Sequence, residues 1–181
     1  MNFFIADTHF GHAGIIHLCN RPFDSVDEMD YRMIEEWNKR VTWNDTVYII
    51  GDLMYRCDDP HWILWHLNGK KRLILGNHDG SWLNKVDVAK HFLSVDSMLE
   101  FSDGKRGLTL CHYPLLSWKR DAKTYMIHGH IHNNTDADYW PLICKRDRLL
   151  NAGVEINGYA PVSFDELLEN NQRWKEAHTI Q

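Results

Sequence analysis

The sequence predicts an α/β domain built on a mixed sheet. Short apolar segments typical of buried strands alternate with helical patterns in the first half and follow one another in the second half. Polar residues able to bind metals follow most of these strands, where open α/β sheets collect their ligand sites. With 181 residues, 44% of them hydrophobic, the chain can bury a core without disulfides, and no linker or repeat interrupts it. We therefore expect a single domain over residues 1–181.

In the first half, three predicted strands alternate with two helices. Ser25 and Glu28 have the spacing of a capping box, and apolar residues at intervals of three and four continue that helix. Asp59 and Pro60 begin the second helix, which is short. In chain order we expect a strand over 2–6, a helix over 26–41, a strand over 46–50, a helix over 60–67 and a strand over 72–75.

The second half is predicted to contain more strands than helices. Asp103 and Gly104 suit a hairpin turn between strands over 97–101 and 108–111. Two further strands are expected at 125–127 and 149–150. Ser163 and Glu166 form a second predicted capping box, which opens a last short helix.

The composition excludes several classes of protein. No apolar run is long enough to span a bilayer, and the N-terminus lacks the regions of a secretory signal. The four cysteines form no C-x-x-C pair, so we expect reduced thiols and a cytoplasmic location. Twenty basic and 25 acidic residues give a net charge of −5, which disfavours a broad nucleic-acid surface but permits a nucleotide or a short strand.

The residues with the clearest chemistry come just after predicted strands. Loops at the carboxyl ends of neighbouring strands would bring them together. Imidazole, carboxylate and amide donors without a thiolate favour Mn²⁺, Fe, Zn²⁺, Ni²⁺ or Co²⁺ over Ca²⁺. Two divalent ions against two carboxylates would leave a positive surplus, which suits an anionic substrate. The residues are Asp7 and His9, Asp52, Asn77 and His78, His112, and His130 and His132.

This ordered set resembles the calcineurin-like metallophosphoesterase superfamily. The family pattern is D-x-H, G-D-x-x-D-R, G-N-H-D/E, a single His and G-H-x-H. One departure is visible, because Tyr55 stands where the second motif has Asp, and this puts the packing around Arg56 in question. The matching blocks are residues 7–9, 51–56, 76–79, 112 and 129–132, so the resemblance spans most of the chain.

The resemblance implies a fold and a set of metal ligands. The fold would be a four-layer α-β-β-α sandwich with two mixed sheets and the metal site at the strand C-terminal ends. The cofactors would be two divalent metal ions, with Mn²⁺ favoured in vitro and Fe, Zn, Ni or Co as alternatives; no organic cofactor is expected. The first ion would be held by Asp7, His9 and His132, the second by Asn77, His112 and His130, and Asp52 would bridge them.

The resemblance also implies a phosphoric ester hydrolase. A hydroxide bridging two metals about 3.5–4 Å apart would attack the phosphate ester. His78 would act on the developing charge or the leaving group, and Asp79 would hold its ring in one tautomer. A phosphodiester is favoured because the chain leaves little material for a cap over the site. The alternatives are a protein or small-metabolite phosphomonoesterase, and a metal-binding module without catalysis. The partner would be a phosphate ester, such as a nucleotide or a short nucleic acid. No membrane partner is expected, and the oligomeric state stays open.

Further residues are candidates for substrate contact. His12 lies in the first ligand loop and could touch substrate or cap the following helix. Arg21 and Arg56 could each clamp a phosphate oxygen or form a salt bridge instead. Trp118 is the candidate for an aromatic beside the substrate. Glu155, after a late strand, could support the rim of the site.

Overall fold

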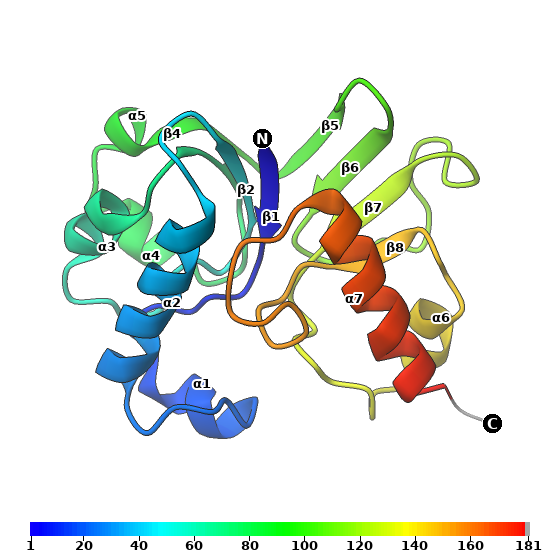
Figure 1. Ribbon diagram of the computed structural model, residues 1–181, viewed down its shortest axis with the longest axis horizontal. Coiled ribbons are helices and arrows are strands. Elements are labelled where there is room, and N and C mark those ends of the chain that lie inside the picture. Colours follow the sequence, from blue (N-terminus) through cyan, green and yellow to red (C-terminus); the bar gives the residue numbers. More distant parts are fainter. Residues whose placement is uncertain (180–181) are drawn as a thin grey trace.

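The computed structural model describes residues 1–179, which form two four-stranded sheets packed face to face (Figure 1). In the first sheet the strand order is β1-β2-β3-β4 and neighbouring strands are parallel. An antiparallel component is limited here to an isolated bridge between Phe4 and Val162. The four strands are β1 (Asn2–Ile5), β2 (Thr46–Ile50), β3 (Lys70–Ile74) and β4 (Phe92–Asp96).

The second sheet is mixed. Its order is β5-β6-β7-β8, with β5 antiparallel to β6 and the other pairs parallel. The predicted hairpin around Asp103 and Gly104 connects β5 to β6, and Ser97 alone separates β4 from β5. The strands are β5 (Met98–Ser102), β6 (Gly107–Cys111), β7 (Tyr125–His128) and β8 (Leu149–Asn151).

Alternate residues of the first sheet face two different cores, as the period of a strand requires. Phe3 and Ile5 join the helix-side core with Trp37, whereas Phe4 joins the core between the sheets. Beyond the second sheet, Trp140 belongs to a third core. The predicted four-layer sandwich is therefore confirmed, with α1–α5 outside the first sheet and α6 and α7 beside the second (Figure 1). The helices are α1 (Ala13–Leu18), α2 (Val26–Arg40), α3 (Pro60–His66), α4 (Gly80–Leu83), α5 (Val88–His91), α6 (Trp140–Cys144) and α7 (Phe164–Ala177).

The two predicted capping boxes form to different extents. At α7 the box is complete, because Ser163 and Glu166 exchange both hydrogen bonds. At α2 the Ser25 side chain accepts the Glu28 N–H at 3.2 Å, but the Glu28 carboxylate accepts the N–H of Asp24 instead of that of Ser25. The last helix has 14 residues and is longer than expected. Four short helices, α1, α4, α5 and α6, and strand β4 were not predicted.

Among residues 1–179 the cysteines form no disulfide bond, and no helix is suited to span a membrane. No helix among residues 1–179 is both long enough and apolar enough to cross a bilayer. All four cysteines are free, and Cys19 and Cys57 are buried. The predicted single domain includes residues 180–181, which lie outside the described part of the chain.

Candidate metal centre

The candidate ligands come from loops that leave the parallel strands at one common edge of the sandwich. The loops after β1, β2 and β3 belong to the first sheet, and those after β6 and β7 belong to the second. In every loop the first candidate ligand lies within three residues of the end of the strand, so the register of the strands determines where these ligands lie. The first sheet contributes Asp7, His9, Asp52 and Asn77, and the second contributes His112, His130 and His132.

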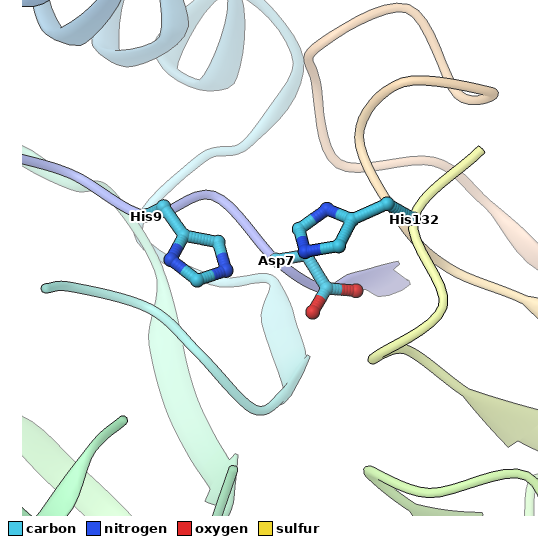
Figure 2. A group of neighbouring side chains, drawn as sticks. All are labelled: Asp7, His9 and His132. Atoms are coloured by element: carbon cyan, nitrogen blue, oxygen red, sulfur yellow. The ribbon is translucent and has the colours of Figure 1, made fainter. Parts of the chain in front are cut away.

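Asp7, His9 and His132 form one group of converging donors (Figure 2). Each offers one ligand atom, and these atoms lie within 4.8 Å of one another. Both ring nitrogens of His9 are buried and have no hydrogen-bond partner within residues 1–179. Burial lowers the pKa of His9 to about 2, which keeps the ring neutral and its lone pair available. A divalent cation fits this donor set, since it would satisfy polar atoms that are otherwise costly to bury.

The surroundings of Asp7 and His132 favour the protonated form of both side chains. Burial raises the pKa of Asp7 to about 7. Burial opposes a charge on His132, but hydrogen bonding with Cys19 and Glu155 and the nearby Asp7 carboxyl raise its pKa to about 11. Surroundings that favour a proton on the His132 ring also favour a metal ion on it. Metal loading would therefore release protons.

Asp52 lies between the two predicted ligand sets. Its Oδ2 is 3.5 Å from His9 Nε2 and 3.5 Å from His112 Nε2, so one oxygen faces a histidine of each set. Its Oδ1 accepts the backbone N–H of His78 at 2.9 Å. Burial alone would raise the pKa of Asp52, but its contacts with His112 and His78 lower it to about 2. The carboxylate is thus ionised and placed between two potential cation positions.

Asn77, His112 and His130 form the second group of donors. Asn77 Oδ1 is 3.1 Å from His112 Nε2 and 3.0 Å from His130 Nδ1. His112 Nδ1 lies 3.0 Å from the Ile50 carbonyl oxygen, to which it donates. In the neutral ring Nε2 is then an acceptor that faces another acceptor on Asn77. A proton on Nε2 or a cation bound between the two atoms would satisfy both acceptors, and a divalent ion fits this set too.

Five of the seven candidate ligands have left-handed backbone. Non-glycine residues seldom adopt positive φ, although Asp, Asn and His tolerate it better than most. Such strain concentrates at functional sites because the surrounding structure must hold it in place. The five are Asp7 (φ 56°), His9 (52°), Asp52 (52°), His130 (71°) and His132 (50°).

Two glycines of the motifs are required by close contact with ligand side chains. Gly51 has a φ of 82°, and a Cβ there would collide with the His112 ring. A Cβ at Gly76 would collide with the Asp52 carboxylate. The glycine before each ligand therefore lets the neighbouring loop approach closely enough to complete the centre.

Comparison with known proteins shows the family to which the chain belongs. A family model described as calcineurin-like phosphoesterase matches residues 3–179. The chain belongs to the calcineurin-like phosphoesterase family. The resemblance expected from the motifs is thereby confirmed, and the phosphoesterase contains clusters of aspartate and histidine able to bind metal.

Relatives of the phosphoesterase extend over nearly its whole length. An uncharacterized protein of Methanocaldococcus jannaschii, MJ1445, is 35% identical over 98% of this chain and 95% of its own length. The Gene 66 protein of Mycobacterium phage L5 is 28% identical over 92% of this chain and 91% of its own. Among solved structures, the Aquifex aeolicus protein AQ665, of unknown function, has a TM-score of 0.73 and 26% identity, covering 93% of this chain and 98% of that one.

His78 lies beside the ligands, whereas Asp79 does not have the predicted role. His78 Nε2 is 3.8 Å from Asp52 Oδ2, and the ring is partly exposed. The Asp79 carboxylate is buried and accepts the backbone N–H groups of Asp52, Leu53 and Gly76 and the indole N–H of Trp82. These four donors occupy both of its oxygens. The expectation that Asp79 holds the His78 ring is therefore wrong, and Asp79 instead joins the loops after β2 and β3.

Arg21 is a scaffold residue of the phosphoesterase and not a phosphate clamp. Its side chain is 0% exposed. The guanidinium donates to Glu155 Oε1 at 2.7 Å and to the carbonyl oxygens of Asp7 and Thr8, both also at 2.7 Å. Glu155 Oε1 also lies 3.0 Å from His132 Nδ1. The prediction of phosphate contact is wrong because buried partners already use this guanidinium, and the alternative salt bridge is present.

His12 and Arg56 both lie beside the Tyr55 ring. The His12 ring is 5.4 Å from that of His9, and its side chain makes no capping bond to α1. His12 therefore stays near the ligands, as substrate contact would require. Arg56 is exposed, with its cation 5.2 Å from the Tyr55 ring, and no salt bridge to it is found within residues 1–179. The Tyr55 ring lies 4.4 Å from that of His12 and 4.7 Å from that of His78, so the motif departure places an aromatic wall beside both histidines.

The sequence motifs do not identify every side chain around the phosphoesterase centre. The Trp118 indole donates to Thr124 and packs against the third core, so it is not an aromatic beside the ligands. Tyr113 takes that place, with its ring 4.5 Å from that of His130. Its position directly after His112 was the only signal in the sequence. Asn151 supports the last ligand loop, because its side-chain amide donates to the His132 carbonyl oxygen at 2.7 Å.

Proposed function

We propose that this protein is a dinuclear-metal-dependent phosphoesterase that hydrolyses phosphodiesters. The position of Asp52 supports the proposal most directly, since one ionised oxygen lies 3.5 Å from a histidine of each ligand set. Family membership supports phosphoester hydrolysis in general. The unpartnered nitrogens of His9 and the facing acceptors of Asn77 and His112 call for cations at two places.

The ligands divide as the motifs suggest. Asp7, His9 and His132 would hold one ion, Asn77, His112 and His130 would hold the second, and Asp52 would contribute to both. When bound, two such ions would supply a nucleophilic hydroxide near neutral pH and would offset the charge of the phosphate.

The remaining side chains bind and orient the ester. His78 lies next to Asp52 with its ring partly exposed, so its Nε2 can reach an oxygen of a phosphate at the centre. In this position a protonated imidazole stabilises charge on that oxygen or donates a proton to the departing alkoxide. The rings of Tyr55 and His9 pack against the His78 ring in T-shaped arrangements, with centroids 4.7 Å and 5.4 Å away. His12 lines the same cavity as His78.

The function is tested with two model substrates and Mn²⁺. We expect the metal-loaded protein to hydrolyse bis-p-nitrophenyl phosphate faster than p-nitrophenyl phosphate, and we expect removal of metal with a chelator to abolish both activities. A preference for the monoester would replace the phosphodiesterase assignment with a phosphatase. Absence of hydrolysis of either ester, with the metals bound, would leave a metal-binding module.

A further inference from the structure

The candidate centre opens sideways into a groove. A cavity of about 520 Å³ begins at the site histidines and continues away from the ligand atoms. This volume lies in the range of pockets that bind small organic ligands. The groove shares its inner end with the centre, so a phosphate bound at the centre would place an ester arm within reach of it. The inner end is lined by His9, His12, His78, His130 and His132.

The groove has one apolar wall and one polar wall. Ile15 and Leu18 of α1 form the apolar wall, and Leu18 is 76% exposed although it lines a cavity. Residues 133–136 form the polar wall, and Tyr139 also lines the groove. The Asn133 side chain donates to the Cys19 carbonyl oxygen at 3.3 Å and ties the two walls together.

The charge of the groove limits what it can bind. Its lining contains no lysine or arginine, and Asp136 is its single carboxylate. The guanidinium of Arg21, which is close in sequence, is fully buried and hydrogen-bonded. Beyond the histidines at its inner end, the groove would therefore present Asp136 to a second phosphate, with no lysine or arginine in the lining to offset the repulsion. A group with an apolar face and hydrogen-bonding edges matches both walls.

We propose that this groove binds one arm of the phosphate ester as an uncharged organic group of the nucleoside kind, so that the preferred substrates carry a single phosphate. The inference rests on the proposed function, because it assigns the ester arm of the same substrate. The groove selects the ester arm of the substrate, and the histidines at its inner end lie beside the candidate metal centre.

The first test compares two diesters that release the same product. One is the p-nitrophenyl ester of thymidine 5′-phosphate, and the other is the same ester with an additional 3′-phosphate. We expect kcat/KM of the Mn²⁺-loaded protein to be about fivefold higher for the ester without the 3′-phosphate. Equal values, or a preference for the additional phosphate, would overturn the proposal.

Charge reversal in one loop supplies a matched pair of variants. Asp136 lines the groove, whereas Asp138 is exposed in the same loop and does not line it. We expect Asp136→Lys to bring the two kcat/KM values together and Asp138→Lys to leave their ratio unchanged. An unchanged ratio in Asp136→Lys, or the same shift in both variants, would show that the arm binds elsewhere.

A binding measurement separates this inference from the proposed reaction. Calorimetry on the Mn²⁺-loaded protein compares methylphosphonate with the methylenephosphonate analogue of thymidine 5′-phosphate, neither of which can be hydrolysed at the P–C bond. We expect the nucleoside analogue to bind more tightly than methylphosphonate. Leu18→Ser should lower the ratio of the two affinities about fivefold. Leu142→Ser, at an exposed position of α6 outside the groove, is the control. No gain from the nucleoside, or an equal effect of both variants, overturns the proposal. Binding without hydrolysis of any ester would instead reject the proposed function.

Discussion

Asp52 reaches both ligand groups through a single carboxylate oxygen. Its Oδ1 is used by the His78 N–H, so only Oδ2 faces His9 and His112. We predict that Asp52→Asn loses both metals, because a neutral amide cannot supply the negative charge between two cations. Metal analysis of the purified variant measures this. Asp58→Asn, an exposed substitution, is the control. Retention of two ions in Asp52→Asn would remove Asp52 from its bridging role.

His78 is expected to act on substrate and not on metal. It lies 3.8 Å from Asp52, but it belongs to neither ligand group. We predict that His78→Ala keeps its metal content and loses about 10²–10⁴-fold in kcat. His61→Ala, an exposed histidine on α3, should retain full activity. A His78→Ala protein with unchanged turnover would contradict the assignment.

The buried Arg21–Glu155 pair connects ligands that are far apart in sequence. Arg21 binds the backbone of the Asp7 loop, and Glu155 holds the His132 ring. We predict that Glu155→Gln lowers metal affinity about 10–100-fold, as loss of the partner of a ligating histidine does. Titration with a competing chelator measures the affinity, and Glu169→Gln on the exposed face of α7 is the control. An affinity equal to that of the unmodified protein would show that the pair only supports packing.

The sequence predicted which side chains converge but not which of them bind each other. Asp7 and His132 could be placed together because both follow strands in a known order of motifs. For Arg21 the sequence leaves phosphate contact and a salt bridge both open, because it does not show the partner, Glu155, which lies 134 residues away. Asp79 was assigned to the His78 ring by adjacency, whereas its actual donors come from two loops. Pairing across the fold depends on distances that a linear pattern does not contain.

Helix α2 supports the first ligand loop through the buried carboxyl group of Asp30. Asp30 accepts the Gly11 N–H at 2.9 Å, while its Oδ1 is buried without a partner within residues 1–179. Burial raises the pKa of Asp30 from 3.8 to about 7. The folded chain therefore holds this proton over a range in which the unfolded chain has released it. As pH rises through this window, release of this proton in the unfolded chain lowers the free energy of unfolding.

Asp30→Asn should remove this pH-dependent loss of stability, because an amide does not titrate. Relative to the unmodified protein, we expect the variant to gain stability as pH rises from about 4 to 7, by a total on the order of 2 kcal/mol. Urea denaturation of the metal-free proteins at several pH values measures the difference. A difference that stays constant across this window would mean that Asp30 has an ordinary pKa in the folded chain.

Capping patterns and apolar periods predicted the longer elements well. Short elements escaped because a single turn gives no periodic signal, as in the four-residue helices α4 and α5. The length of α7 was underestimated, since Asn170 and Asn171 are weak helix formers. Asn171 is buried in α7, where its side chain binds the backbone N–H of Asn151 in β8. Tertiary contact therefore extends a helix that local propensity alone would end.

The centre lies across the two sheets, so its occupancy connects the halves of the molecule. Asp52 and Asn77 belong to the first sheet, and His112 and His130 belong to the second. Without cations, the link at this edge includes the hydrogen bond from the His130 N–H to the Asp7 carboxylate. Two metal ions would tie both sheets to the same carboxylate of Asp52 and raise the stability of the whole domain.

The central claim is that two cations bind on either side of Asp52. A crystal grown with Mn²⁺ and recorded near the manganese absorption edge tests it most directly. The account predicts two anomalous peaks about 3.5–4 Å apart, one beside Asp7, His9 and His132 and the other beside Asn77, His112 and His130. A map with no peak there, or with Asn77 and His112 turned away from Asp52, would contradict it.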